Sequence, residues 1–208
     1  MLTSIFRSTV IDFLITSVAS DDSSVVAYFY FDYLTNKSPE EFLRSLVKQL
    51  CQASKHLPPS ILRIQERWKA GEYDEGQQSI MYDVLAGFFD LTAQFNRTFV
   101  CLDALDECLD QHRHVLRDLL NRIMKSGCRL MASSRPGEFF KNLFQNCSSI
   151  EIRIETSNID EYLRSAFDKH PKLEDMMDDN LKKLVIDTIR KTSCGLSVCV
   201  FIDVLGYC

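Results

Sequence analysis

Glycine is scarce in this chain, with seven residues among 208. A loop that cradles nucleotide phosphates needs glycines, so that its backbone can approach closely, and a lysine after them. The one glycine pair at the right spacing, Gly71 and Gly76, encloses three carboxylates and is followed by Gln77 instead of lysine. Because these charges would repel phosphate, we interpret the segment as an exposed turn.

Long apolar runs and basic runs are also missing. No stretch of 18 or more apolar residues occurs, so the sequence predicts no membrane-spanning helix. Lysine and arginine are interspersed with acidic residues, and the formal net charge is -5. This balance gives no electrostatic reason for nucleic-acid binding. We therefore expect neither a membrane nor a nucleic-acid partner.

The first twenty residues superficially resemble a secretory signal. Asp12 interrupts the apolar stretch that such a signal requires. Six apolar or β-branched residues fall on one helical face instead: Ile5, Phe6, Thr9, Val10, Phe13 and Leu14. The segment is thus expected to be an amphipathic helix, and the protein to be cytoplasmic.

The eight cysteines contain no Cys-x-x-Cys pair. Cys101 lies within a strand-like apolar run, Cys128 opens another, and Cys51 ends a helical stripe. Such positions favour buried free thiols in a reducing compartment over a disulfide framework.

Strand-like and helix-like segments alternate along the chain. Short runs rich in β-branched and aromatic residues predict four strands, at Val25–Phe31, Thr98–Leu102, Cys128–Ser133 and Ile150–Ile154. Helical spacing fills the intervals, and Ser38 with Glu41 forms a capping-box pattern. Strands separated by helices imply parallel pairing, so we expect an α/β fold with three layers. Residues 1–156 would form the α/β domain and 157–208 a helical extension, with helices expected at Asn158–Phe167 and at about Asn180–Lys191.

An acidic cluster follows the second predicted strand. Asp103, Asp106 and Glu107 come directly after the apolar run. Ligands bind at the carboxyl ends of parallel strands, where a carboxylate can hold Mg²⁺ and a neighbour can orient an attacking water. We predict a metal role for Asp103 and a catalytic role for Asp106 and Glu107, in the pattern of a Walker B segment.

The third predicted strand ends in Ser133-Ser134-Arg135-Pro136. An arginine at a strand tip beside the acidic strand can contact a γ-phosphate. It can equally form a salt bridge with Asp103 or Asp106, and the residues alone leave both readings open. Ser134 and Arg135 are the predicted phosphate-binding residues.

Together these motifs resemble the NACHT-type NTPases of the STAND class, and in particular the nephrocystin-like N-terminal domain of many fungal NACHT proteins, often found ahead of ankyrin or WD repeats. The resemblance spans about residues 1–193. It is carried by Val26–Asp32, Phe42–Leu50, Leu102–Cys108 and Ser133–Pro136.

The resemblance implies a P-loop NTPase fold, Mg²⁺ with ATP or GTP as cofactors, and homo- or hetero-oligomers of NACHT proteins. It equates Asp103 with the Walker B Mg²⁺ residue, Asp106 and Glu107 with the acidic pair near the attacking water, and Arg135 with the sensor arginine. The sequence begins after the point where the first strand and its Gly-Lys-Thr loop would stand. The expectation is a domain truncated after Walker A.

The family strand order, 5-1-4-3-2, places the missing strand between the predicted strands Cys128–Ser133 and Ile150–Ile154. We expect the latter to shift and pair directly with the former. The alternatives are a strand donated by a partner chain, or filling of the slot by the β-branched tail Val198–Ile202.

Three functional readings remain. The leading one is a degenerate nucleotide-dependent switch, non-catalytic or very weakly nucleotide-binding, with no cofactor in this chain. The second is a fragment of an active ATPase or GTPase. The third is a non-catalytic interaction module that associates with intact NACHT proteins.

Overall fold

The computed structural model describes residues 2–18, 21–35, 37–72, 78–153, 165, 178–193 and 197–203. Contacts divide the chain into one unit of Met1–Ile150 with Val200–Cys208 and a second unit of Glu151–Cys199. The predicted domain boundary at residue 156 remains a prediction.

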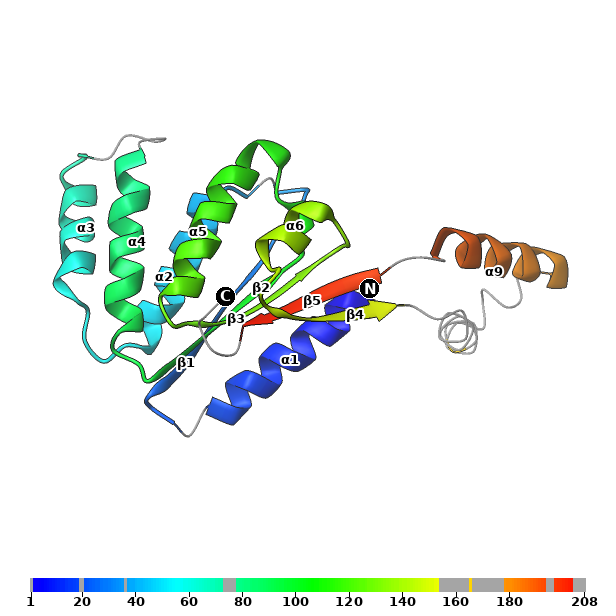
Figure 1. Cartoon of the computed structure of the whole chain (residues 1–208), viewed down its shortest axis with the longest axis horizontal. Helices are drawn as coiled ribbons and strands as arrows, with labels where there is room; N and C mark the ends of the chain where they lie inside the picture. Colours follow the sequence, from blue (N-terminus) through cyan, green and yellow to red (C-terminus); the bar gives the residue numbers. More distant parts are fainter. Residues whose placement is uncertain are drawn as a thin grey trace. The chain divides into compact units, whose positions relative to one another are not determined.

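Helices and strands alternate as expected through most of the chain (Figure 1). The α-helices are α1 (Leu2–Val18), α2 (Pro39–Ala53), α3 (Pro59–Lys69), α4 (Gln78–Thr92), α5 (Arg113–Lys125), α6 (Glu138–Leu143) and α9 (Asp179–Ser193). The strands are β1 (Ser24–Tyr30), β2 (Arg97–Asp103), β3 (Arg129–Ser134), β4 (Ser148–Arg153) and β5 (Ser197–Asp203). Two short 3₁₀ turns, η1 (Leu105–Glu107) and η2 (Asp110–His112), follow β2.

The predicted cap of α2 is confirmed. The Ser38 hydroxyl accepts the Glu41 N–H at 3.2 Å, and the Glu41 carboxylate accepts the Ser38 N–H at 2.8 Å. Each bond satisfies an N–H that the first helical turn would leave without a partner. The sequence thereby fixes where α2 begins.

The first three strands form a parallel block. Val25 pairs with Thr98 and Phe29 with Leu102, while Leu102 pairs with Ala132. Consecutive strands thus lie side by side, as the alternation of strands and helices predicts. The expected mixed α/β fold is observed, with a five-stranded sheet in the order β1-β2-β3-β5-β4.

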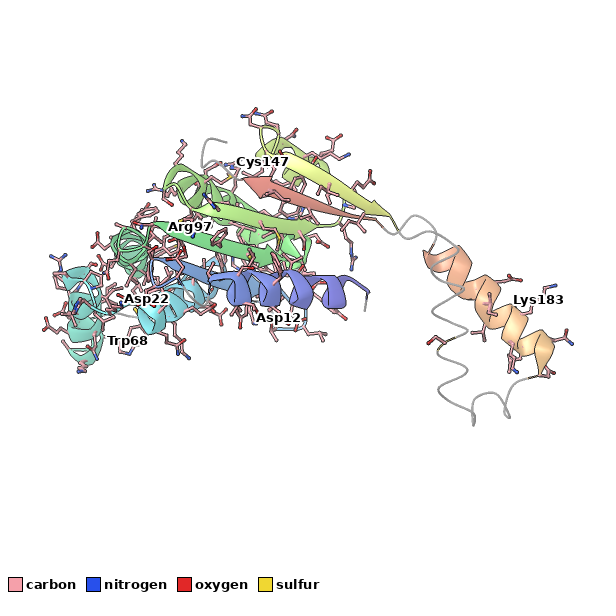
Figure 2. All side chains as sticks on the ribbon, turned by 90° about the horizontal axis from the view of Figure 1, so that it is seen from below. Asp12, Asp22, Trp68, Arg97, Cys147 and Lys183 are labelled. Atoms are coloured by element: carbon pink, nitrogen blue, oxygen red, sulfur yellow. The ribbon has the colours of Figure 1, made fainter. Side chains whose placement is uncertain are left out.

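Helices cover both faces of this block, because successive side chains of a strand point to opposite faces. On one face, Phe29 of β1 and Phe31, which directly follows this strand, lie against Phe42 of α2, with ring centroids 5.5 and 5.7 Å from that of Phe42. On the other face, Asp12 of α1 lies close enough to Tyr30 for its charge to contribute to the raised pKa of this tyrosine. Figure 2 labels Asp12 on α1. Figure 1 accordingly shows α1 on one side of the strands and α2, α4 and α5 on the other.

One inward-facing residue of α1 differs from the prediction. Ile11 is buried at 3% exposure, whereas Phe13 is 68% exposed. The helix is present as expected, but its buried side is rotated relative to the predicted stripe. The apolar residues of α1 extend around much of the helix, so spacing alone did not identify the packed side.

The outer edge of β1 is closed by a side chain. The Gln49 amide oxygen accepts the Tyr28 N–H at 3.0 Å, and its amide nitrogen donates to the Tyr28 carbonyl at 2.8 Å. Unpaired groups at a sheet edge favour pairing with other chains. Gln49 imitates a short piece of neighbouring strand and blocks this edge.

The prediction for the last strand is wrong. β4 does not pair directly with β3, because β5 lies between them and is hydrogen-bonded to both. β5 contains the β-branched tail Val198–Ile202, which was one of the two alternatives for this slot. It supplies partners to two strand edges at once and buries Cys199, Val200 and Phe201 at 7%, 4% and 5% exposure. Direct pairing of β3 with β4 would leave this apolar segment without a place in the sheet.

The C-terminal portion is therefore not purely helical as expected. The helix predicted near Asn180–Lys191 is confirmed as α9, but residues 197–203 form a strand. The helix predicted at 158–167 lies outside the described residues except for Ser165. Among the described residues, no helix has the length and apolar character needed to cross a membrane.

Free thiols are confirmed at Cys51, Cys101 and Cys128. The expectation is wrong at Cys147, which is disulfide-bonded. Burial raises the pKa of the Cys101 thiol to about 12, so this cysteine acts as a small apolar residue in the core.

Candidate functional site

The predicted site residues gather at the carboxyl edge of the parallel block. Tyr30 pairs with Asp103 and Leu102 with Ala132, so Asp103 and Ser133 are the next residues on neighbouring strands. The loops after β1, β2 and β3 therefore leave the sheet together. In a parallel sheet this is the edge where ligands bind.

Asp103 is almost completely buried, at 4% exposure. Its carboxylate accepts a hydrogen bond from the Ser133 hydroxyl. The Ser133 oxygen in turn accepts the Ala104 N–H at 3.1 Å, and the Asp103 carbonyl accepts the Phe31 N–H at 3.0 Å. The acidic residue thus fastens the ends of β1, β2 and β3 to one another.

Directly after Asp103 the backbone takes a strained turn. Ala104 has φ 56° and ψ 48° and is the only non-glycine residue with positive φ among those described. This left-handed conformation costs an alanine about 1–2 kcal/mol. The bond to Ser133 and the Glu107 N–H to Ala104 carbonyl bond of 2.9 Å hold it in place. The turn brings Asp106 and Glu107 back toward the sheet edge.

Asp106 binds the loop after β3. Its carboxylate accepts the Arg135 backbone N–H at 2.9 Å and lies 3.4 Å from the Arg135 Nε. The expectation that Arg135 lies near Asp103 or Asp106 is confirmed, and of its two readings the structure contains the salt bridge. The Arg135 side chain is 67% exposed, so the ion pair itself contributes about 0–1 kcal/mol.

Glu107 and Ser134 complete the predicted set. The Glu107 carboxylate accepts the Tyr33 N–H at 3.4 Å, which joins it to the loop after β1. The Ser134 hydroxyl donates to the Arg135 carbonyl at 2.8 Å. Ser134 therefore shapes its own loop, and the hydroxyl that contacts Asp103 belongs to Ser133.

Ser133 is a site residue that was not among the predicted ones. A signal for it exists in the sequence, because alternate residues of a strand point to the same face. With Ala132 beside Leu102, Ser133 must share a face with Asp103 while Ser134 points to the other. Finding this signal requires the strand register, which the sequence does not state.

The charge of Asp103 affects Tyr30 on the neighbouring strand β1. The pKa of Tyr30 is raised, first by burial and then by the charges of Tyr28, Asp103 and Asp12. Tyr30 therefore stays a neutral phenol next to Asp103. Its hydroxyl is not a base or nucleophile near neutral pH.

The residues present fit one half of a Mg²⁺–nucleotide site. The Asp103 carboxylate and the Ser133 hydroxyl are hard oxygen donors of the kind that Mg²⁺ prefers, although burial leaves a hydrated cation little access to them. For the phosphates, the sequence offers no glycine-rich cradle with a lysine. Within the described part of the chain, no three His, Cys, Asp or Glu side chains are grouped to hold a metal. The edge thus offers oxygen donors of the type that a cation prefers, without a grouped set of metal ligands among the described residues and without a phosphate cradle in the sequence.

A separate cavity of about 590 Å³ lies at the opposite, amino-terminal edge of β2 and β3. Its lining includes Phe89, Thr98, Arg122, Lys125 and Ser126. None of the predicted site residues lines it. The cavity and the acidic edge are therefore distinct features of the fold.

Comparison with known families gives a match over the first two thirds of the chain. The family model described as "Nephrocystin 3, N-terminal" matches residues 3–135, which include β1, β2 and β3 and end at Arg135. Comparison with curated proteins and with solved structures gives no match.

Proposed function

Since the chain belongs to the nephrocystin 3 N-terminal family, we propose that it is a NACHT-related signalling module derived from a nucleotide-dependent switch, and that it binds nucleotide weakly or not at all. It acts in this proposal without hydrolysing ATP or GTP. Its partners are other NACHT-related chains.

The observation that carries this proposal is the engagement of the acidic edge by the chain's own groups. Asp103 is held by Ser133, Asp106 by Arg135, and Glu107 by the Tyr33 N–H. These contacts tie together the loops after β1, β2 and β3. Each of these carboxylates already accepts a hydrogen bond from a neighbouring loop. Before it can contact a metal-bound phosphate, this donor must be displaced, which makes the free energy of binding less favourable.

The phosphate side of such a site needs positive charge and converging backbone N–H groups. Among the three predicted carboxylates, the described ion pairs join Asp106 to Arg135. A single exposed arginine cannot offset three phosphate charges in water. We expect an ATP or GTP affinity weaker than about 1 mM, which corresponds to less than about 4 kcal/mol.

A second candidate function is phosphate sensing by Arg135. The observation that favours it is the weak, exposed pairing of this side chain with Asp106, at 3.4 Å and 67% exposure. A phosphate in reach of the loop would compete with Asp106 for the guanidinium. In this candidate the Arg135–Asp106 pair is the resting state of a switch.

Titration calorimetry with Mg-ATP and Mg-GTP tests both candidates. For the non-catalytic module, we expect no binding tighter than about 1 mM in the wild type or in Asp103→Ala. For phosphate sensing, Asp106→Ala frees Arg135 and raises the affinity, while Arg135→Ala removes it. Arg117→Ala is the matched control, because Arg117 is also an exposed arginine paired with a carboxylate, that of Asp118.

Micromolar binding that disappears in Asp103→Ala would overturn the proposed function and would indicate a working nucleotide site. The partner class is tested separately by size-exclusion chromatography of the chain mixed with an intact NACHT protein. Co-elution at the summed mass is expected, and separate elution at all concentrations contradicts that part of the proposal.

A further inference from the structure

The slot between β3 and β4 is filled by a strand that returns from the far end of the chain. β5 is hydrogen-bonded to β3 on one side and β4 on the other. Without it, two strand edges inside the sheet would lose their hydrogen-bond partners, which is costly when they are buried and aggregation-prone when they are exposed. The fold therefore requires a strand in this slot.

β5 is held in the slot by specific side-chain contacts as well as by backbone hydrogen bonds. Cys199, Val200 and Phe201 are buried to 7% exposure or less. The Phe201 ring stacks on that of Phe144, which follows α6, with centroids 4.6 Å apart and planes 23° apart. A strand with another side-chain pattern would not make these contacts, so the slot selects the sequence of β5.

The connection to β5 is far longer than its pairing requires. Figure 1 shows β4 and β5 running in opposite directions, and antiparallel neighbours can be joined by a two-residue turn. Here residues 154–196 intervene between the two strands. All of the intervening chain belongs to the second unit, and the first unit resumes only at Val200.

With such a long connection, the β5 of the same chain has only a modest advantage over the β5 of another copy in occupying the slot. Closing a loop of this length costs more entropy than closing a tight hairpin, and the effective concentration at which a tethered segment reaches its site falls as the linker lengthens. A β5 from a second copy would make the same hydrogen bonds and the same stack on Phe144. It competes once the protein is concentrated, and mutual exchange gives a closed, two-fold symmetric dimer.

We propose that the slot between β3 and β4 accepts β5 from a second copy of this chain, so that the protein forms a strand-exchanged dimer in equilibrium with the monomer described here. The proposal rests on the sheet topology and is independent of nucleotide binding. The partner is a second copy because its β5 alone is certain to carry the side chains that fit the slot.

The first test is the oligomeric state of the wild-type chain. We expect size-exclusion chromatography with light scattering to show a dimer whose share rises with protein concentration and decays slowly after dilution, because strands must leave the sheet to exchange. A monomer at every concentration up to the solubility limit would overturn the proposal.

The second test identifies the surface that forms the dimer. The double variant Phe144→Cys/Phe201→Cys is prepared ¹⁵N-labelled and unlabelled, mixed at high concentration, and bridged with a short bis-maleimide, whose two ends each add to one cysteine thiol. Peptides joining positions 144 and 201 are then mapped by mass spectrometry. Strand exchange gives joined peptides carrying one labelled and one unlabelled half. Joined peptides with equal labels only, in a dimer fraction, would overturn it.

Two single variants distinguish a specific effect at the slot from a general effect of an added charge. Phe201→Asp places a charge in the slot, whereas Leu184→Asp places one on α9 at a residue that is 62% exposed. We expect Leu184→Asp to keep the wild-type dimer share and Phe201→Asp to lose the dimer. Persistence of the dimer in Phe201→Asp contradicts strand exchange.

Discussion

The two outer strands of the sheet are held in different ways. β1 is flanked by its sequence neighbours α1 and α2, pairs with the next strand β2, and has its free edge closed by Gln49. β4 is held through β5, which arrives from the far end of the chain, and its Ile150 is 55% exposed. The family match ends at residue 135 and so includes the first side of the sheet but not the second.

It follows that contacts between sequence neighbours secure one side of the sheet, while a single distant segment secures the other. The β1–β3 side should behave as the stable core of the first unit. The β4–β5 side should depend on whether the tail is in its slot. Each of the following predictions probes one side of this contrast.

The largest effect is expected at Phe42. This ring has 0% exposure and touches the rings of Phe29 and Phe31. Phe42→Ala should lower the free energy of unfolding by about 4–5 kcal/mol, since it removes a large buried side chain and leaves a cavity. Urea denaturation followed by circular dichroism measures this. A loss below about 1 kcal/mol would show that β1 and α2 do not form the core.

A slightly smaller effect is expected at Phe201. Phe201→Ala should lower the free energy of unfolding by about 3 kcal/mol, because it removes a buried ring and the stack of that ring on Phe144. Near-ultraviolet circular dichroism and tryptic digestion should report the change along with urea denaturation. If β5 belongs to the same cooperative unit as β1–β3, urea denaturation shows one transition shifted to lower urea concentration, and trypsin cleaves the chain only in that transition. Early cleavage after β4 without loss of the main transition would mean that the β4–β5 side unfolds separately.

At the acidic edge, Ser133→Ala should cost about 1–3 kcal/mol. The substitution takes the hydroxyl from the buried Asp103 carboxylate and the acceptor from the Ala104 N–H, and unsatisfied buried groups are expensive. Ser134→Ala is the control, because Ser134 is also buried but bonds only its own loop at the Arg135 carbonyl. Thermal unfolding should separate the two variants, and equal losses would contradict the role assigned to Ser133.

The smallest effect is expected at Asp21, where the chain enters β1. Hydrogen bonds from the Ser23 and Ser24 hydroxyls and then from Arg97 hold the pKa of Asp21 well below its usual value of 3.8. A carboxylate with a lowered folded pKa stabilises the fold above its unfolded pKa, and this contribution is lost as the pH falls toward the folded value.

The melting temperature of the wild type should therefore fall more steeply than that of Asp21→Asn between about pH 5 and pH 2. Asp22→Asn is the matched control, since the Asp22 pair with Lys55 is exposed on both sides. We expect Asp22→Asn to follow the wild-type acid profile. An Asp21→Asn profile parallel to that of the wild type would contradict the assignment.

The sequence by itself determined the elements whose signals are local. The capping box at Ser38, the apolar run of β2, and the position of the acidic cluster behind it all depend on residues close together in the chain. The neighbouring positions of Asp106 and Arg135 also followed, because consecutive parallel strands end at one edge. The packed side of α1 did not follow from spacing, because apolar residues lie around much of that helix; Phe13, which was expected to face inward, is exposed.

Only the tertiary structure decided features that join distant residues. Ser133, and not Ser134, contacts Asp103 because of a strand register that no local pattern states. Gln49 closes the edge of β1 across 21 residues, and β5 enters the slot between β3 and β4 from the end of the chain. The physical reason is common to all three: a hydrogen bond or a buried contact is selected by what else competes for it, and those competitors become neighbours only when the chain has folded.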